Sequence, residues 1–469
     1  MEPTSSSRLR QDSPWLTIIL ASLSGLLAAL DSSVNIAFPA ISVAFQVDIA
    51  LIQWVVVSYV LTYASLLLGC GRLADLLGHG RVLFWGILVS GLAFLACGLA
   101  PNFSWFLAAR VVQGLGAALV LATAPALVTL AVPAEMRGRA LGIFQMGAAV
   151  GFALGPLLGG VLVDAVGWRA VYLFRLVPAG VLVTLSLRQP RTLAQSFPSL
   201  HALDLPGVLT LAGSVAGLLL ALNRSRDLGW ASPLVMTLLV GAGGSFATFL
   251  AYERRSATPI IDLSLFRHAA FAIANALNVL ANCAMFAIWL LVPYYLVNVL
   301  GYQATFGGLL LMACPLATAF AAPLAGRLSD SIGTGPLSAV GLGIESVGLW
   351  LLSRLDTATP ELSVVAALSL VGFGLGVFQT PNMSFVMGTI PREQQGIAGG
   401  MSQMMRTLGV VLGVTGAGLL FSSRRAAYAL QLHLADANAG QTFMPAFQDV
   451  FLVATVLSAA AFVMAISRR

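Results

Sequence analysis

Long apolar stretches alternate with short polar connections along almost the whole chain. Hydropathy and turn residues divide the sequence into fourteen candidate spans, most of them close to the roughly 20 apolar residues that a helix needs to cross a bilayer. The pattern predicts an all-α integral membrane protein with about 14 transmembrane helices. The predicted spans cover residues 15–39, 52–71, 82–99, 105–132, 140–163, 168–187, 205–222, 233–252, 269–299, 306–326, 337–352, 362–390, 397–421 and 447–466.

The spans fall into groups of six, two and six, because more polar stretches follow the sixth and the eighth span. This grouping predicts an N-terminal six-helix bundle over residues 1–187, a linker with two accessory transmembrane helices over residues 188–268, and a C-terminal six-helix bundle over residues 269–469. Residues 71–78 and 326–333 indicate a duplication, since Gly, Arg, Leu, Asp and Gly recur in both at identical spacing. A repeat of this kind predicts a substrate site between the halves, near the membrane midplane.

Composition narrows the class of protein. Hydrophobic residues make up 58% of the chain and charged residues 9%, against roughly 45–50% and 25% in an average soluble protein. This excludes an ordinary soluble enzyme, and the sequence contains no phosphate-loop, HExxH or GxSxG motif. The four cysteines lie in apolar runs without a CxxC pair, so neither a metal site nor a disulfide is predicted. We expect a secondary transporter rather than an enzyme, without a cofactor and with protons as the coupling ion.

The basic residues predict the orientation in the membrane. Loops on one side of the predicted spans hold fifteen of the 24 basic residues, and loops on the other side hold six. Because basic residues favour cytoplasmic loops, we expect a multi-pass protein of the cell membrane with both termini in the cytoplasm. The basic residues lie mostly at helix ends, so no nucleic-acid partner is indicated. Membrane lipid and a small amphiphilic substrate are the expected partners, and the sequence leaves the oligomeric state open, a monomer included.

Two ionisable residues at membrane depth are the leading functional candidates in the first half. Asp31 lies well inside the first span, where a carboxylate costs about 2.5–3.5 kcal/mol and therefore needs a partner, water or a task. Arg110 in the fourth span is its natural partner; Gln113 shares the helix face of Arg110, and Asn35 shares that of Asp31. Asp31 is thus a candidate for proton coupling, the alternative being an acid tied permanently to a basic partner. For Arg110 the alternative is a topology arginine near a helix end.

Glycines recur at every fourth residue of the fifth span, at Gly147, Gly151, Gly155 and Gly159, and Pro156 lies among them. Such a stripe allows backbone-to-backbone packing, and the proline permits a bend. A bare glycine stripe indicates only helix packing. Its position beside the ionisable pair favours a hinge or a seal.

The second half carries further polar residues at membrane depth. Asn275, Asn278 and Asn282 lie on one face of the ninth span, and the same face continues to Trp289. This face fits an amphiphilic ligand and hydrogen bonds between helices equally well. Glu345 is a second candidate for proton coupling. The other substrate-cavity candidates in this half are Gln379, Asn382 and Arg406.

Four segments resemble motifs of the major facilitator superfamily, and specifically of its fourteen-helix drug:proton antiporter branch. They are residues 30–39, 71–81, 110–114 and 151–160, and the resemblance extends over nearly the whole chain. The resemblance implies alternating access between two six-helix bundles, with Asp31 associated with proton coupling. Among the motif residues and their repeat in the second half, it implies gating or hinge roles for Gly71, Arg72, Asp75, Gly78, Arg81, Gly151, Gly155, Pro156, Gly159, Arg327 and Asp330.

Two positions depart from the family pattern. Arg175 stands in the sixth span where the family usually has Asn, and this cation either favours an anionic or zwitterionic substrate or pairs locally. The second loop signature lacks a counterpart of Arg81, so its gate is expected to be weaker. The sequence predicts a proton-coupled antiporter that exports a small amphiphilic drug, dye or metabolite. The alternatives are a proton-independent facilitator or a lipid or lipophilic-anion translocator of the same fold, and a non-transporting receptor.

Overall fold

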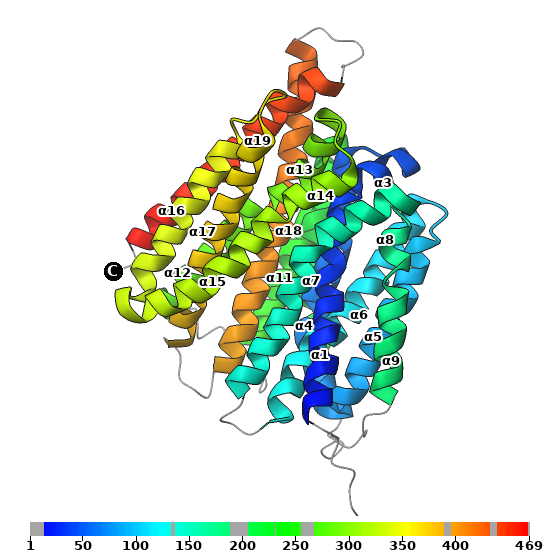
Figure 1. The fold of residues 1–469 in the computed structure, drawn as a ribbon, viewed down its shortest axis with the longest axis vertical. Coiled ribbons are helices and arrows are strands. Elements are labelled where there is room, and N and C mark those ends of the chain that lie inside the picture. Colours follow the sequence, from blue (N-terminus) through cyan, green and yellow to red (C-terminus); the bar gives the residue numbers. More distant parts are fainter. Residues whose placement is uncertain are drawn as a thin grey trace, which may run out of the picture.

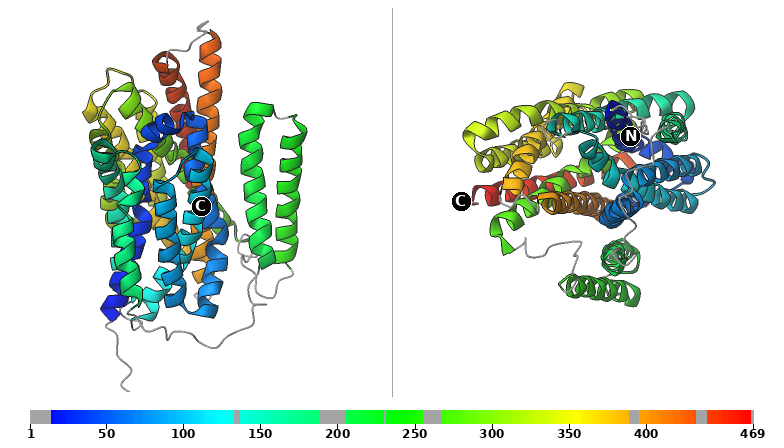
Figure 2. Two further views of the ribbon diagram at one scale, coloured as in Figure 1. Left: turned by 90° about the vertical axis from the view of Figure 1, so that its right-hand side faces the viewer. Right: turned by 90° about the horizontal axis from the view of Figure 1, so that it is seen from below.

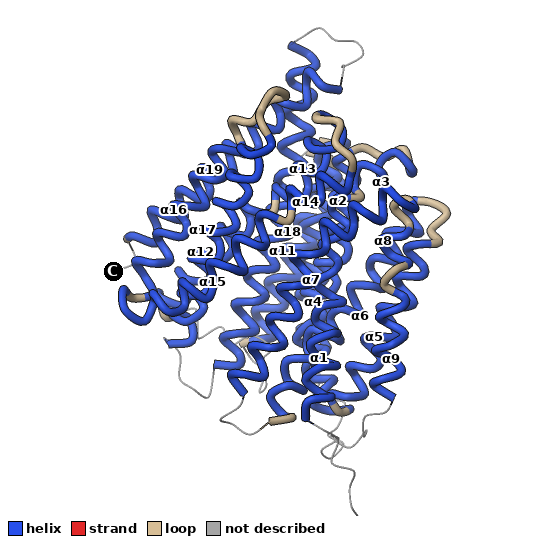
Figure 3. Tube along the Cα trace, in the orientation of Figure 1, coloured by secondary structure: helices blue, strands red, loops and turns tan. Residues whose placement is uncertain are grey.

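The structure is a computed structural model that describes residues 14–132, 137–187, 205–229, 231–254, 267–388, 395–431 and 439–467. The described residues are helical and contain no strand (Figure 3), which confirms the predicted all-α class. Twelve helical segments among them are long and apolar enough to cross a membrane. Two shorter apolar segments, Leu51–Leu67 and Leu209–Leu218, correspond to the two spans by which the predicted number differs.

The first half of the chain forms one bundle. Its elements are α1 (Pro14–Ala29), the 3₁₀ turn η1 (Leu30–Ser32), α2 (Ser33–Ile36), α3 (Phe38–Phe45), α4 (Ile49–Leu77), α5 (His79–Gly98), α6 (Phe103–Leu130), α7 (Arg137–Val166), α8 (Ala170–Leu173) and α9 (Leu176–Leu187). Side-chain caps begin two of these helices. Asp48 accepts the N–H of Leu51 at 2.9 Å at the start of α4, and Asn102 accepts the N–H of Trp105 at 2.8 Å at the start of α6.

The second half forms the other bundle, beside the first (Figure 1). Its elements are α12 (Ala269–Met285), α13 (Ala287–Tyr294), the π-helical turn η5 (Tyr295–Val299), α14 (Ala304–Leu311), α15 (Ala313–Ile332), α16 (Thr334–Leu352), α17 (Glu361–Gly388), α18 (Gln395–Gln431) and α19 (Ala439–Ile466). The repeated loop segments have the same shape in both halves. Gly78 and Gly333, the last glycine of each, adopt φ angles of 92° and 93°, which other residues rarely adopt.

Two accessory helices, α10 (Leu205–Leu228) and α11 (Pro233–Glu253), connect the halves in sequence. Figure 2 shows them as an antiparallel pair standing beside the main body. The Ser245 hydroxyl of α11 donates to the Thr210 carbonyl of α10 at 2.7 Å. Of the pair, α10 packs on the bundles, against α4 and α18. The pair therefore covers the seam between these two helices from outside.

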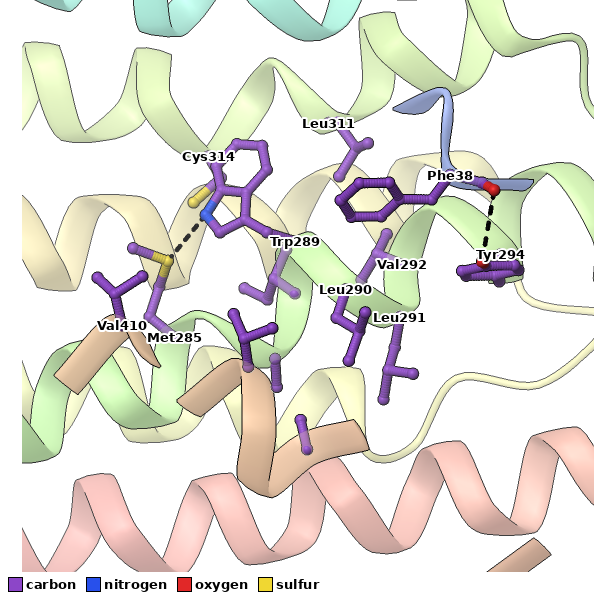
Figure 4. Close-up of a cluster of buried hydrophobic side chains, with 14 of the residues drawn as sticks. Phe38, Met285, Trp289, Leu290, Leu291, Val292, Tyr294, Leu311, Cys314 and Val410 are labelled. Atoms are coloured by element: carbon purple, nitrogen blue, oxygen red, sulfur yellow. Dashed lines mark hydrogen bonds between the residues drawn. The ribbon is translucent and has the colours of Figure 1, made fainter. Parts of the chain in front are cut away.

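The halves meet along three seams: α4 with α18, α7 with α14, and α2 and α3 with α13. One continuous apolar core crosses these seams and includes Phe38 and Trp289. Figure 4 shows the Trp289 indole N–H directed at the Met285 sulfur, 3.2 Å away, and the Tyr294 hydroxyl directed at the Phe38 carbonyl. Trp289 is only 1% exposed, so the structure packs this predicted cavity residue inside the core.

Candidate functional site

The first transmembrane segment is broken at its acidic residue. α1 gives way to the 3₁₀ turn η1, with Asp31 at its centre, before the helix resumes in α2. Two serines explain the break, because the Ser32 hydroxyl donates to the Ala29 carbonyl at 3.1 Å and the Ser33 hydroxyl donates to the Leu30 carbonyl at 2.7 Å. Such side-chain bonds compete with the regular helical ladder. A short 3₁₀ stretch inside a helix often marks a hinge.

Asp31 accepts four hydrogen bonds from three side chains. The Arg110 guanidinium binds both carboxylate oxygens, at 2.8 and 2.9 Å, and the Arg175 guanidinium binds Oδ1 at 2.8 Å. The Gln113 amide donates the fourth bond at 2.8 Å. The two arginine side chains are 1% and 0% exposed, whereas 15% of the Asp31 side chain remains exposed. The pairing of Asp31 with Arg110 that the sequence predicts is present in the structure.

Further contacts fix both arginines. Arg110 donates from Nε to the Val55 carbonyl at 2.8 Å and lies over the Tyr59 ring, 4.5 Å from its centroid. Arg175 donates to the Ser33 hydroxyl at 2.7 Å and to a backbone carbonyl of η1 at 2.9 Å. A guanidinium presents several donors in a rigid fork, so these bonds fix its orientation as well as its position. The site is assembled from α1, η1, α2, α4, α6 and the junction of α8 with α9.

The Asp31 cluster, defined as Asp31, Arg110 and Arg175, contains one carboxylate and two guanidinium groups. It therefore carries a net charge of +1 inside the first bundle. The sequence places Arg175 among the candidates that line a substrate cavity, with local pairing as the alternative. The structure has the local pairing, since Arg175 is fully buried and its charge is directed at Asp31.

A contact between η1 and α7 explains the glycine and the proline of the fifth span. Pro156 has no N–H, so the carbonyl four residues earlier, that of Phe152, lacks its helical donor. The Ser32 hydroxyl donates to this carbonyl at 3.0 Å. Gly155 provides the space, because a Cβ there would overlap the Ser32 hydroxyl. The residue next to Asp31 is thereby bonded to α7.

The other glycines of the stripe pack on the same segment. A Cβ at Gly147, Gly151 or Gly159 would meet a backbone carbonyl of α1 or α2. Close approach of this kind is what small residues permit between membrane helices. The stripe therefore serves helix packing along its whole length, and at Gly155 it also serves the bond from η1.

α7 also contacts the second half of the molecule. A Cβ at Gly308 would overlap the Pro156 backbone, and a Cβ at Gly160 would overlap the Ala304 backbone, so α7 and α14 meet backbone to backbone. The Phe152 ring lies 5.1 Å from the ring of Trp289 in α13. α7 therefore touches η1 on one side and the second half on the other.

Polar contacts join the halves at the end of the molecule that carries α3, α13 and α14, near the top of Figure 1. The Asp164 carboxylate accepts the backbone N–H groups of Ala304 at 3.1 Å and of Thr305 at 2.7 Å, at the start of α14. An acid at this position accepts hydrogen bonds from free N–H groups and interacts favourably with the positive end of the helix dipole. The hydroxyl groups of Ser42 and Tyr294 lie 2.6 Å apart across a neighbouring seam.

We expect Asp164→Asn to weaken the contact between the halves at the start of α14. An amide has no charge and only one acceptor oxygen, whereas two N–H groups need an acceptor there. Loss of a side-chain cap costs about 0.5–2 kcal/mol, so the population separated at this end should rise several-fold. Spin labels at Val166 and Leu362, which are 76% and 79% exposed, would report it as a longer distance. Asp48→Asn changes a cap within one half and is the control. Identical distance distributions in wild type and Asp164→Asn would contradict the expectation.

The asparagine face of α12 is buried and bonded between helices. Asn278 donates to the Ser402 carbonyl of α18 at 2.9 Å, and the Ser402 hydroxyl donates to Asn275 at 3.0 Å. Asn382 of α17 donates to a carbonyl of α12 at 3.1 Å, and Asn282 donates to the Asn278 carbonyl at 2.8 Å. None of the four is more than 9% exposed. Of the two interpretations that the sequence permits, the structure has interhelical hydrogen bonding at Asn275 and Asn278, whereas Asn282 bonds within α12.

Glu345 lies within the second bundle, apart from the Asp31 cluster. Its side chain is fully buried on α16, whose backbone at Glu345 meets α17 at Gly374, and Ser458 of α19 is nearby. Neither carboxyl oxygen has a hydrogen-bond partner in the part of the chain that the structure describes. Its place inside the bundle separates it from the seams where the halves meet.

Two of the predicted cavity residues keep free polar groups. Arg406 on α18 is half-buried and makes neither a hydrogen bond nor an ion pair with any described residue. The Gln379 amide nitrogen on α17 also has no partner among these residues. Asn35, one turn after Asp31, is half-buried. Gln113, by contrast, is occupied within the Asp31 cluster.

The predicted gating residues outside α7 lie near the ends of α4 and α15 and at the start of α5. Gly71 has open space around it and Gly78 has the positive φ angle described above. Arg81 and Arg327 are exposed. The side chains of three others, Arg72, Asp75 and Asp330, lie outside the described part of the structure.

Sequence reasoning misses Asp164, Ser32 and Tyr59. For Ser32, the sequence offers one signal, which is its position next to an acid in a membrane span. Polar residues beside such an acid tend to form hydrogen bonds that stabilise the site. Asp164 falls at the end of a span, where an acid is ordinary. Tyr59 lies in an apolar run whose contact with Arg110 depends on how α4 and α6 pack.

Comparison with known proteins decides the family. The model described as Major Facilitator Superfamily matches residues 20–414 and, in a second match, residues 274–468. The chain belongs to the Major Facilitator Superfamily. As a superfamily member it is a multi-pass membrane transporter, not an enzyme.

Relatives within the superfamily include drug-resistance proteins. The multidrug resistance protein Stp of Mycobacterium tuberculosis (strain ATCC 25618 / H37Rv) is 36% identical over 400 residues, which cover 85% of this chain and 74% of that one. The tetracenomycin C resistance and export protein of Streptomyces glaucescens is 29% identical, with 88% and 76% covered. The riboflavin transporter RibZ of Clostridioides difficile (strain 630) is 28% identical, with 85% and 86% covered.

The superfamily fold is also found in solved structures. A bacterial homologue of the human lysosomal transporter Spinster, in an inward-facing and unoccupied conformation, superposes with a TM-score of 0.71. The superposition covers 99% of this chain and 98% of that one, at 16% sequence identity. This likeness concerns the fold.

Proposed function

We propose that this superfamily member is a proton-coupled antiporter that exports a small amphiphilic compound by alternating access. It belongs, on this proposal, to the fourteen-helix drug:proton branch and lies in the cell membrane with both termini in the cytoplasm. The observation that carries the proposal is the Asp31 carboxylate, which lies at the centre of a helix break and is bound by Arg110 and Arg175. Asp31 is the proton-binding group.

A proton couples to motion when its binding changes the contacts of a mobile element. Protonation of Asp31 removes the charge that both guanidinium groups bind and weakens four hydrogen bonds together. Neither arginine can give up its own proton, so the exchangeable proton resides on the carboxylate. The serine-bonded turn η1 is then free to rearrange.

A contiguous set of contacts links η1 to the second half. Ser32 is bonded to α7, and α7 packs through Pro156 on Gly308 of α14. Asp164, near the end of the same helix, is bonded to the first residues of α14. A change at η1 therefore acts on the helix that carries the polar contacts between the halves.

The proposed cycle begins with the outward-facing molecule, in which Asp31 takes up a proton. Its ties to the two arginines weaken and the halves rock inward. Substrate enters from the cytoplasm or the inner leaflet, and the proton leaves to the cytoplasm. In the state after proton release, Asp31 is paired with both arginines. In the same state, Asp164 binds the start of α14 and joins the halves at that end. Gly155 and Pro156 serve as the seal between α7 and the first segment.

The relatives support export of a small amphiphile. Two of the three named above are drug-resistance proteins, and one of these carries export in its name. The third is a riboflavin transporter, so relatives of this chain act on more than one chemical class.

The test is dye transport in inverted membrane vesicles that contain the protein. Ethidium, rhodamine 123 and fluorescein are offered separately, a proton gradient acid inside is imposed, and a protonophore is then added. We expect at least one dye to accumulate with the gradient and to leave when the gradient collapses. Accumulation should be accompanied by proton release from the vesicles.

Glu345→Gln provides a matched control, because it neutralises a carboxyl group buried inside the second bundle without touching the Asp31 cluster. It should retain gradient-driven transport. Transport that persists unchanged after the protonophore, with no movement of protons, would establish the proton-independent facilitator instead.

A further inference from the structure

Arg406 is a cation at membrane depth without a counter-charge. It lies on α18, the helix that packs on α4 between the halves, and its side chain is half-buried. The Nε atom is buried and has no hydrogen-bond partner, and the two terminal nitrogens remain accessible and equally unbonded to any described residue. An arginine inside a membrane protein normally pairs with a carboxylate or with backbone carbonyls. Arg406 therefore has donors available for a group from outside the chain.

Neither Asp31 nor Glu345 forms an ion pair with Arg406 in the described structure. Asp31 already serves two guanidinium groups, those of Arg110 and Arg175. Glu345 is fully buried inside the second bundle, between α16, α17 and α19. The Asp31 cluster thus carries one net positive charge, and Arg406 carries another.

Arg406 interacts with an aromatic residue of the first half. The side chain interacts electrostatically with the Tyr63 hydroxyl of α4, which also senses the charge of Asp31. The rings of Tyr63 and Tyr59 are 5.3 Å apart, and Arg110 lies over Tyr59. Tyr63 therefore interacts with the charge of Arg406 from the second half and with the charge of Asp31 from the first.

Neighbouring amides add neutral donors. Gln403 lies one helical turn before Arg406 on the same face of α18 and is exposed. The Gln379 amide nitrogen on α17 has no partner in the described residues. Unpaired donors of this kind suit oxygen acceptors, and an arginine fork suits a carboxylate or a similar oxyanion. The tyrosine rings supply apolar and aromatic surface beside them.

We propose that Arg406 recognises an anionic oxygen group of the transported compound, so that the substrate is an amphiphilic organic anion. The inference rests on the proposed function and names its substrate class. It also assigns anion binding to Arg406 instead of Arg175. Arg175 forms an ion pair with Asp31, whereas Arg406 forms none with any described residue. Because α18 carries Arg406 and packs on α4 of the other half, a bound anion contacts a helix that the rocking motion displaces.

Binding of two dyes to the purified protein in detergent tests the proposal. Fluorescein and rhodamine 123 share a xanthene ring system but differ in charge, the first anionic and the second cationic. We expect wild type to bind fluorescein at least tenfold more tightly than rhodamine 123, measured by fluorescence anisotropy. Arg406→Gln should lose at least tenfold in fluorescein binding without weakening rhodamine 123. Arg406→Lys, which keeps the charge but not the fork, should fall between the two.

Arg424→Gln removes the same charge from an exposed position on the same helix and is the matched control. It should bind both dyes as wild type does. The proposal is overturned if fluorescein binds wild type no more tightly than rhodamine 123 or not at all, or if Arg406→Gln binds it as wild type does. The wild-type comparison requires no variant, so it decides the charge preference even where Arg406→Gln fails to fold.

Binding in detergent needs no gradient, which separates this inference from the proposed function. Anion preference without gradient-driven transport in vesicles would overturn only the antiporter. Gradient-driven transport without anion preference would overturn only the role of Arg406.

Discussion

Asp31→Asn is expected to abolish gradient-driven transport and to destabilise the folded protein. The amide cannot take up and release a proton in the physiological range, so the coupling step is lost. It also leaves two buried guanidinium groups without the carboxylate that they share. Removing one partner of a buried ion pair costs about 3–5 kcal/mol. Dye accumulation in vesicles and the temperature at which the detergent-solubilised protein loses its monodisperse peak measure the two effects.

A second substitution separates coupling from stability. The double variant Asp31→Asn with Arg175→Gln removes one of the two uncompensated cations, so we expect it to regain part of the lost stability. It should still show no gradient-driven transport, since no titratable group has returned to η1. Full transport by Asp31→Asn at matched expression would make Asp31 structural. Glu345 would then become the coupling candidate, in spite of its position inside the second bundle.

Gly155→Val is expected to have the other large effect, on assembly of the first bundle. Its Cβ would overlap the Ser32 hydroxyl and press on the Ser33 backbone. The bond from Ser32 to the Phe152 carbonyl would be lost with it, and Pro156 leaves that carbonyl without another donor. Overpacking and an unsatisfied buried carbonyl together cost of order 3 kcal/mol. The yield of monodisperse protein should fall sharply.

Gly180→Val is the matched control, because nothing lies within 4 Å of a Cβ at that glycine. It should give wild-type yield and transport. Ser32→Ala removes the hydrogen bond without adding bulk, and we expect it to fall between the other two. If Gly155→Val yields as much stable protein as Gly180→Val, the contact between η1 and α7 does not have the tight geometry described above.

Most of the fold can be predicted from the hydropathy pattern. A span must satisfy its own backbone hydrogen bonds in lipid, so an apolar stretch of sufficient length permits hardly any structure but a helix. The two segments that fall short of the length criterion, in α4 and α10, lie in helices that end in charged residues. The pairing of Asp31 with Arg110 was predictable for a similar reason, since each charge at membrane depth requires a partner.

The rest depends on contacts that the sequence does not specify. Arg175 is 144 residues from Asp31, and nothing in its neighbours separates a cavity-facing cation from one that binds an acid. The asparagine face of α12 has the same periodicity whether it meets a ligand or Ser402. The role of Asp164 becomes visible only when the start of α14 is known to lie beside it.

The surplus charge of the Asp31 cluster has an electrical consequence. One carboxylate and two guanidinium groups leave a full positive charge inside a bundle of membrane-spanning helices. Any rearrangement that shifts this cluster along the membrane normal moves that charge through the transmembrane field. The work is about 2.3 kcal/mol for an elementary charge carried through a full drop of 100 mV. The membrane voltage therefore biases the balance between any two conformations that differ in this way, even in a molecule with nothing bound.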